Sequence, residues 1–349
     1  MLWLWIGLGI VGFLLLAALG LHINILWNYI PVLVRIFQEK PLFIIPFGQP
    51  IPEAEDVDLN TADGLTLKGC YLKCAGPRKG VILFGPEFGA SRWGCMPYGE
   101  FLLQNGYDVF SFEMRGQGQS QAQPGYEPLQ WLTEYELEDF QTAVEYLKKR
   151  PDADARGVGF FGMSKGGSAG LWITAHDSYI RCAVTDGAFS IISTMLPYMK
   201  QWIYIYSRVT IMVKIIPHWY FVWIAHIGIG RISRLRNARY PILEREVHKI
   251  APRPWLMIHG AKDNYIKPVM AEELFAFAGE PKEFWLVEKA KHNQAMQTAE
   301  GEYKRRVLEF FDRNLADKPA GREGVALPVG QASPNGAATK ERSPQTVKV

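Results

Sequence analysis

The feature that most constrains the fold of this chain is the alternation of short apolar runs with segments of helical periodicity. The apolar runs lie at 80–85, 107–116, 157–162, 180–189, 254–260 and 283–290. The segments with apolar residues at helical spacing lie at 96–106, 134–150, 168–176, 267–279 and 301–315. Parallel strands covered by helices on both faces read as continuous apolar runs. We therefore predict an α/β fold with a mostly parallel sheet flanked by helices, preceded by a hairpin over 56–74 that turns at Asp63-Gly64.

The N-terminal residues form a separate segment. The run at 2–23 is apolar throughout, and no Asp, Glu, Lys or Arg precedes Arg35. Such a run is long enough to cross a bilayer as a helix. A cleaved signal peptide is the alternative, but signal peptides usually begin with basic residues and have a shorter apolar core. We predict a single-pass membrane protein with an uncleaved anchor over 1–34, and Arg35 and Lys40 place the rest of the chain on the cytoplasmic side.

The alternation stops between residues 190 and 247. The stretch 199–230 is rich in Trp, Tyr and Ile, but the cations Lys200, Arg208 and Lys214 interrupt it. Because charged residues interrupt this stretch, we predict that it forms a helical lid and not a second transmembrane helix. Large aromatic side chains with scattered cations suit a lid that lines a pocket or rests on lipid, with ordinary helical core as the alternative.

These patterns divide the chain into an anchor, a linker, a two-part core, a lid and a tail. The predicted ranges are 1–34 for the anchor, 35–55 for a Pro-rich linker, 56–189 and 248–316 for the core, 190–247 for the lid, and 317–349 for a disordered tail. The chain has 38 Lys and Arg against 35 Asp and Glu, so a formal charge of +3 gives no electrostatic argument for nucleic acid as a partner. The four cysteines form no CxxC pair that would indicate a zinc site.

The apolar run at 157–162 leads directly into Gly162-Met163-Ser164-Lys165-Gly166. The pattern Gly-x-Ser-x-Gly between a strand and a helix is that of the nucleophile elbow, in which a tight turn lifts the serine hydroxyl above the sheet. A glycine-rich connector is the alternative interpretation, because the pentapeptide alone matches by chance. The preceding buried strand and the following small-residue helix favour Ser164 as a nucleophile.

A serine hydroxyl needs a base, and the base needs a carboxylate that orients it. Of the seven histidines, His292 follows a predicted strand on a loop before the final helix, at the edge where parallel strands end. Asp263 lies just after the strand at 254–260, and Asp186 ends another strand. We predict His292 as the base and Asp263 as its carboxylate, with Asp186 as the alternative.

The order Ser164, Asp263, His292 and the elbow context resemble the alpha/beta-hydrolase superfamily over residues 56–316. The resemblance implies the alpha/beta-hydrolase fold, with the lid inserted after the sixth strand. The sequence "FEMRGQGQS" at 112–120 is similar to the turn after the fourth strand in serine hydrolases of this group, which implies a structural role near the elbow. "GMSKGG" is similar to the elbow of acyl-CoA thioesterases.

The resemblance also implies an oxyanion hole, and here the sequence departs from the family pattern. Many relatives carry His-Gly after the third strand, where this chain reads Phe84-Gly85-Pro86-Glu87-Phe88. Proline has no N–H to donate. The first donor is then the N–H of Lys165, and the second is that of Glu87 or, as the alternative, of Phe88.

The sequence thus predicts a membrane-anchored serine hydrolase of carboxylic esters or thioesters that works through an acyl-enzyme. The predicted mechanism requires no metal or cofactor. The aromatic lid favours a small-molecule or lipid-like acyl substrate. A peptidase or acyltransferase on the same triad is one alternative, since one fold hosts many activities. A catalytically silent membrane-bound binding protein is another. The oligomeric state stays open.

Overall fold

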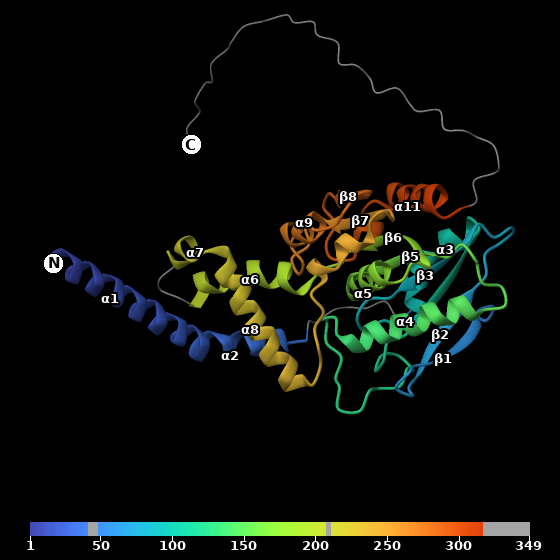
Figure 1. Cartoon of the computed structure of the whole chain (residues 1–349). Coiled ribbons are helices and arrows are strands. Elements are labelled where there is room, and N and C mark those ends of the chain that lie inside the picture. Colours follow the sequence, from blue (N-terminus) through green and yellow to red (C-terminus); the bar gives the residue numbers. More distant parts are fainter. Residues whose placement is uncertain (41–47, 207–210, 317–349) are drawn as a thin grey trace, which may run out of the picture. The chain divides into compact units, whose positions relative to one another are not determined.

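The computed structural model describes residues 1–40, 48–206 and 211–316 (Figure 1). The expected tail at 317–349 and part of the expected linker, 41–47, lie outside the described residues. The centre is an eight-stranded sheet with the strand order β1-β2-β4-β3-β5-β6-β7-β8. Its strands are β1 (Glu55–Asn60), β2 (Thr66–Leu72), β3 (Gly80–Gly85), β4 (Tyr107–Phe112), β5 (Val158–Met163), β6 (Ile180–Asp186), β7 (Trp255–Gly260) and β8 (Lys282–Val287).

The strand pairing confirms the predicted sheet. β1 and β2 form the expected antiparallel hairpin, and β2 also pairs antiparallel with β4. All other neighbouring strands are parallel. The strands β3, β4, β5 and β7 are buried along their whole length, which explains why they read as continuous apolar runs.

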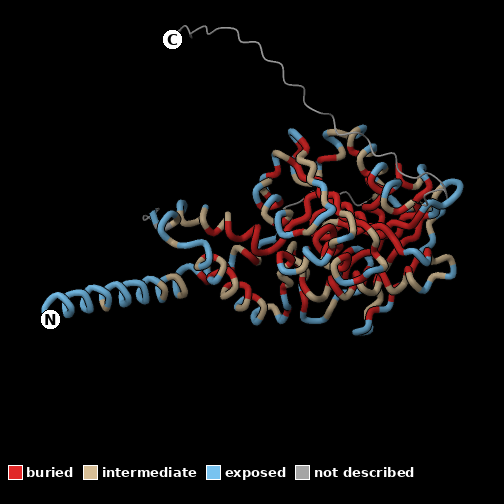
Figure 2. The backbone as a smooth tube through the Cα atoms, turned by 45° about the horizontal axis from the view of Figure 1, so that its top comes forward, coloured by how far each residue is buried: buried red, intermediate tan, exposed pale blue. Residues whose placement is uncertain are grey.

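Helices cover both faces of the sheet. Successive side chains of a strand point to opposite faces, and in β3 Leu83 belongs to one apolar cluster whereas Phe84 belongs to the other. The helices α4 (Glu134–Lys149), α5 (Ser164–His176) and α9 (Pro268–Ala276) pack on the Leu83 face. The helices α3 (Met96–Gln104) and α11 (Glu300–Asn314) pack on the Phe84 face. Figure 2 shows the resulting buried core around the sheet.

Several short helical turns complete the core. They are η2 (Arg92–Cys95), η3 (Leu243–Arg245), η4 (Val247–Ile250) and α10 (Ala295–Thr298). Helix α4 begins with a capping box, because Thr133 and Glu136 satisfy each other's backbone N–H groups. Arg115, from the predicted turn after β4, is fully buried and binds Asp139 of α4. That turn therefore fixes α4, and through Gln117 it also accepts a hydrogen bond from Gly89 of the loop after β3.

The chain between β6 and β7 forms the helices α6 (Ile191–Tyr206), α7 (Met212–Ile215) and α8 (His218–Arg236). Residues 207–210 of the expected lid, among them Arg208, lie outside the described ranges. The three helices follow the sixth strand, as the predicted fold requires. They build an apolar cluster of their own, separate from the two clusters on the sheet.

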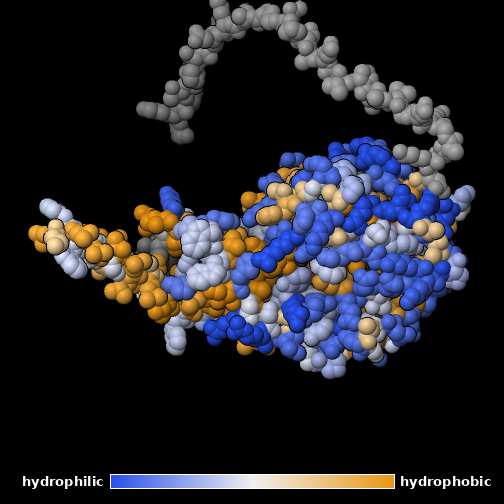
Figure 3. Space-filling view, viewed as in Figure 1, coloured by the Kyte–Doolittle hydropathy of each residue, from blue (hydrophilic) through white to orange (hydrophobic). Residues whose placement is uncertain are grey.

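The N-terminal segment is helical from Leu2 to Phe37, in three parts. α1 (Leu2–Asn24) has no buried residue, η1 (Ile25–Tyr29) is a π-helical turn, and α2 (Ile30–Phe37) buries one face. By length and composition, this helix is the one in the described part of the chain that could cross a membrane, and an anchor and a signal sequence both fit that description. Apolar side chains cover α1 and the helices near it, whereas the surface over the sheet is mostly hydrophilic (Figure 3).

Helix α2 packs on α8 and not on the sheet. Leu33 lies over Gly228, where a Cβ atom would approach a Leu33 methyl group to 2.5 Å. Ile30, Val34 and Phe37 join the same cluster. The residues from Arg35 to Phe37, expected to begin a linker, are therefore a helical turn held by the lid.

Candidate active site

The turn between β5 and α5 has the geometry of a nucleophile elbow. β5 ends at Met163, and Ser164 opens α5 with a φ of 49°, a strained value for a residue with a side chain. A Cβ atom on Gly162 would lie 2.5 Å from the Phe160 ring, and one on Gly166 would lie 2.2 Å from the Pro86 carbonyl oxygen. Gly162 and Gly166 are therefore required, because the Phe160 ring and the Pro86 backbone leave no room for a side chain at either position.

Ser164, His292 and Asp263 form one hydrogen-bonded chain. The Ser164 Oγ atom lies 3.0 Å from His292 Nε2, and His292 Nδ1 lies 2.6 Å from Asp263 Oδ2. The other Asp263 oxygen accepts the backbone N–H groups of Tyr265 and Ile266 at 2.8 and 2.9 Å. These bonds fix the carboxylate after β7, and the carboxylate in turn orients the imidazole on the loop after β8. The structure thus brings together the three residues named from the sequence.

Asp186, the alternative carboxylate, has a different partner. Its Oδ2 atom accepts the hydroxyl hydrogen of Tyr303 at 3.0 Å. Its Oδ1 atom has no hydrogen-bond partner among the residues that the structure describes. Burial raises the pKa of Asp186 to about 7, although the Tyr303 bond and the charge of His292 oppose the rise.

His259, at the end of β7, is a second imidazole beside Asp263. Its Nε2 atom lies 2.7 Å from the carbonyl oxygen of Ile266 and 3.5 Å from Asp263 Oδ2. Burial lowers the pKa of His259, although the charge of Asp263 and the hydrogen bond to Ile266 oppose the shift. The sequence could have indicated that His259 lies near Asp263, because it lies at the end of the strand that Asp263 follows, only four residues earlier.

The loop after β3 packs against the elbow and reaches the loop that bears His292. The Glu87 carboxylate accepts a hydrogen bond from the side-chain amide of Asn293, next to His292. Burial raises the pKa of Glu87, although Asn293 and the charge of His292 lower it. The carboxylate is thus directed toward the His292 loop. No local sequence pattern pairs Glu87 with Asn293, because the two residues lie 206 positions apart.

The Lys165 side chain turns away from the site into the protein core. Its Nζ atom donates to the Leu129 carbonyl oxygen at 2.6 Å and to Glu136 at 2.8 Å, and both charged side chains are fully buried. The backbone N–H of Lys165 belongs to the first turn of α5, where amide groups have no partner within the helix. Lys165 can therefore offer its amide to the site while its side chain holds the segment before α4.

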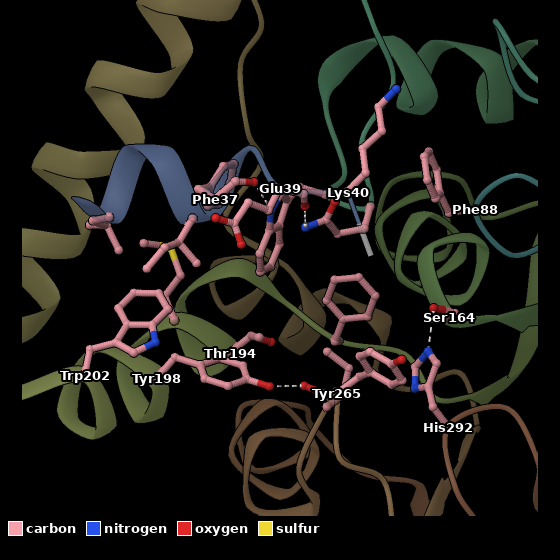
Figure 4. A pocket seen from close by; sticks show the side chains of 17 residues that line it. Phe37, Glu39, Lys40, Phe88, Ser164, Thr194, Tyr198, Trp202, Tyr265 and His292 are labelled. Carbon is pink, nitrogen blue, oxygen red and sulfur yellow. Dashed lines mark hydrogen bonds between the residues drawn. The ribbon is translucent and has the colours of Figure 1, made fainter. Parts of the chain in front are cut away.

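A cavity of about 360 Å³ adjoins the serine. Ser164 and His292 lie at one end, and Trp202 lies at the opposite end (Figure 4). Apolar and aromatic side chains from α2, α6 and the loops around the elbow form most of the wall, among them Phe37, Phe88, Trp131 and Phe189. Within the described ranges, no group of three or more His, Cys, Asp or Glu residues is arranged to hold a metal ion.

Comparison with known proteins adds family evidence to this geometry. The model of the prolyl oligopeptidase family matches residues 98–318. The uncharacterized protein YfhR of Escherichia coli (strain K12) is 25% identical over 272 residues, which cover 76% of this chain and 83% of YfhR. Thiohydrolase aneE of Aspergillus aculeatus is 30% identical over 133 residues, which cover 37% of this chain and 40% of that protein.

A solved structure matches the fold. The Pyrococcus furiosus esterase Pf2001 superimposes with a TM-score of 0.59 and 21% identity over 80% of this chain and 98% of that chain. The alpha/beta-hydrolase fold predicted from the sequence is confirmed by this match together with the sheet order.

Proposed function

The chain belongs to the prolyl oligopeptidase family of alpha/beta-hydrolase serine hydrolases, and from this premise we propose that it is a membrane-anchored enzyme that cleaves carboxylic esters or thioesters. The observation that carries the proposal is the continuous chain of hydrogen bonds from Ser164 through His292 to Asp263. In this proposal Ser164 is the nucleophile, His292 the general base and acid, and Asp263 the residue that orients the imidazole.

The reaction proceeds in two halves. Ser164 Oγ attacks the substrate carbonyl carbon while its proton passes to His292 Nε2, and Asp263 stabilises the imidazolium that forms. The tetrahedral intermediate then expels the alcohol or thiol, which takes the proton from His292, and an acyl-enzyme remains. A water molecule attacks the acyl carbonyl after giving a proton to His292, and that proton returns to Ser164 as the carboxylic acid leaves.

The oxyanion of the intermediate needs hydrogen-bond donors. The backbone N–H of Lys165 is the first donor in the proposal, and its place at the start of α5 adds the favourable end of the helix dipole. The N–H of Glu87 is the second, with that of Phe88 as the alternative, because Pro86 has none. The bond from Asn293 supports Glu87 in this role, since it directs the carboxylate away toward the His292 loop.

The cavity and one relative support the proposed substrate class. The wall beside Ser164 is mostly apolar, which favours an acyl group over a charged one. The likeness to a thiohydrolase supports thioesters alongside esters. The exposed apolar helix α1 supports anchoring of the enzyme in a membrane, and Arg35 and Lys40 beyond it favour a cytoplasmic catalytic domain.

A peptidase is the second candidate, because the matching family is described by its oligopeptidases. The same triad cleaves amides when the site protonates the leaving amine. Parallel assays with p-nitrophenyl butyrate and with a prolyl p-nitroanilide separate the two activities. We expect ester cleavage to dominate, and a higher kcat/KM for the anilide would reverse the assignment.

The direct test of the proposed function is labelling of the full chain in mild detergent with a fluorophosphonate. We expect Ser164 to be modified in wild type and the label to be absent from Ser164→Ala, which should also lose ester hydrolysis by at least about 10⁴-fold. Folded wild-type protein that neither takes the label nor hydrolyses the ester would contradict the proposal. Protease protection on sealed vesicles tests the orientation of the anchor.

A further inference from the structure

A second cavity lies beside the first, at the junction of the N-terminal helix with the lid. Its volume is about 640 Å³, larger than the 360 Å³ of the cavity at Ser164. Residues from α1, η1 and α2 form one side, and residues from α6 and α8 form the other. Its apolar wall includes Ile25, Ile30, Ile203, Phe221 and Ile224. The mechanism proposed above makes no use of this space.

The two cavities share part of their walls. Leu33 and Trp202 line both of them. Trp202 lies at the end of the first cavity that is farthest from Ser164 (Figure 4). Leu33 is held in place by its contact with Gly228 of α8. The two cavities therefore adjoin at Leu33 and Trp202, and together their walls extend from Ser164 to the C-terminal end of α1.

The far end of this path meets the part of the protein closest to the proposed membrane anchor. Leu21 and Asn24, the last residues of α1 along the wall, line the second cavity. The aromatic residues Trp219 and Trp223 of α8 are 65% and 46% exposed beside it. Exposed tryptophans near the end of an apolar helix are typical of the interface between lipid and water. This end of the second cavity therefore lies next to the side chains that suit such an interface.

We propose that the second cavity binds the distal half of a long, unbranched acyl chain whose carbonyl carbon lies at Ser164, so that the substrate is a membrane-derived long-chain ester or thioester. The inference rests on the proposed hydrolase function. A methylene chain matches the mostly apolar walls of the two cavities, in which Asn24, Asn28 and Arg35 are the polar exceptions of the second. For a soluble ester that reaches the site from water, each further buried methylene group should raise kcat/KM by about fourfold until the second cavity is full.

A pair of photoreactive fluorophosphonates tests this path in the full-length chain in phosphatidylcholine vesicles. In both probes Ser164 Oγ bonds to phosphorus, fluoride leaves, and the serine proton passes to His292; the alkyl group on phosphorus takes the place of the acyl chain. One probe carries a butyl and the other a hexadecyl group, each ending in a diazirine. After irradiation, we expect the hexadecyl probe to cross-link to residues of the second cavity such as Ile203 or Ile224. The butyl probe should cross-link only within the first cavity.

A matched pair of variants on α6 gives an independent measurement. Ile203 is half-buried and lines the second cavity, whereas Ile205, two residues further on, is 61% exposed and lines neither cavity. Ile203→Trp should lower the ratio of kcat/KM for p-nitrophenyl palmitate to that for the butyrate by at least about tenfold. Ile205→Trp should leave this ratio unchanged. Labelling of Ser164 by the butyl probe checks that each variant is folded.

The outcomes separate this inference from the proposed function. Absence of Ser164 labelling by either probe contradicts the proposed function itself. Labelling by both probes, with the hexadecyl chain cross-linked only to the first cavity or to surrounding lipid, overturns the second cavity as an acyl site. An unchanged palmitate preference in a labelled Ile203→Trp variant overturns it as well.

Discussion

The buried ion pair between Lys165 and Glu136 behind the nucleophile makes a quantitative prediction. Glu136 accepts hydrogen bonds from Lys165 at 2.8 Å, from the Tyr126 hydroxyl at 2.7 Å and from the Thr133 backbone at 2.9 Å. Lys165 has one further acceptor, the Leu129 carbonyl oxygen. Burial opposes ionisation of both groups; the charge of Lys165 and the hydrogen bonds nevertheless lower the pKa of Glu136. Burial lowers the pKa of Lys165 as well, but the 2.8 Å contact and the further hydrogen bonds on both sides are those of an ion pair in which each charge depends on the other.

The magnitude follows from what each substitution leaves behind. Lys165→Met leaves a buried carboxylate, and Glu136→Gln leaves a buried ammonium group, so each should destabilise the fold by about 3–5 kcal/mol. The double variant leaves no charge, and its main defect is the unpaired Leu129 carbonyl, which costs about 1–3 kcal/mol. The double variant should thus be at least about 3 kcal/mol more stable than the sum of the single effects predicts.

Equilibrium denaturation of the full chain in detergent micelles, followed by tryptophan fluorescence, measures these free energies of unfolding. Lys148→Met is the matched control, because Lys148 lies on α4 in ion pairs whose lysine is 32% exposed, and its loss should cost less than about 1 kcal/mol. Single effects that add within about 0.5 kcal/mol in the double variant would refute the reasoning. The KM for p-nitrophenyl butyrate should also rise in Lys165→Met, because Leu129 precedes the cavity residues Gln130 and Trp131.

Three further predictions concern the surroundings of His292. Asp263→Asn should reduce kcat by about 10⁴-fold, whereas Asp186→Asn should keep it within about tenfold, because only Asp263 bonds to the imidazole. The pKa of Asp186 is raised from 3.8 to about 7 in the folded state, so the unfolded chain loses this proton first and stability falls as the pH rises between these two values. Asp186→Asn should remove up to about 4 kcal/mol of this fall in the free energy of unfolding, which denaturation of wild type and variant at several pH values between 3.8 and 7 would measure. The same pH dependence in both proteins would contradict the raised pKa of Asp186. Gly187→Ala should lower kcat by about 10- to 100-fold, because a Cβ atom at a φ of 67° would lie 2.6 Å from Asn293 Oδ1 and 3.2 Å from the His292 ring. A wild-type rate in this variant would mean that the His292 loop yields without loss of alignment.

The positions of the strands and of the three hydrogen-bonded side chains could be predicted because their signals are local. The strands before Ser164 and Asp263 are apolar on both faces, and His292 follows the partly exposed edge strand β8. The parallel arrangement of these strands brings the three residues to one edge of the sheet. Their roles in catalysis remain a proposal that the labelling and substitution experiments test.

Contacts between distant elements could not be predicted in the same way. Periodicity indicates which face of α4 is buried, but it does not say that Glu136 meets Lys165 on the neighbouring helix. For α2 a signal was present, since Ile30, Leu33, Val34 and Phe37 follow the spacing of an amphipathic helix. The strong apolarity of the residues before it obscured this pattern, and the helix was assigned in part to the anchor and in part to the linker.

The place of α2 has a consequence for any shortened form of the protein. Leu33, Ile36 and Phe37 of this helix are part of the cavity wall beside Ser164, although they lie among the first forty residues. A chain cut within α1 would lose most of the exposed apolar stretch and keep the residues of α2 in the wall of the cavity beside Ser164. A chain cut after Lys40 would be more soluble, yet it would open the cavity beside Ser164 to water and expose the apolar face of α8. A chain that begins close to Asn24 lacks most of the exposed apolar helix, which favours solubility, and it keeps α2 in the wall of the cavity beside Ser164.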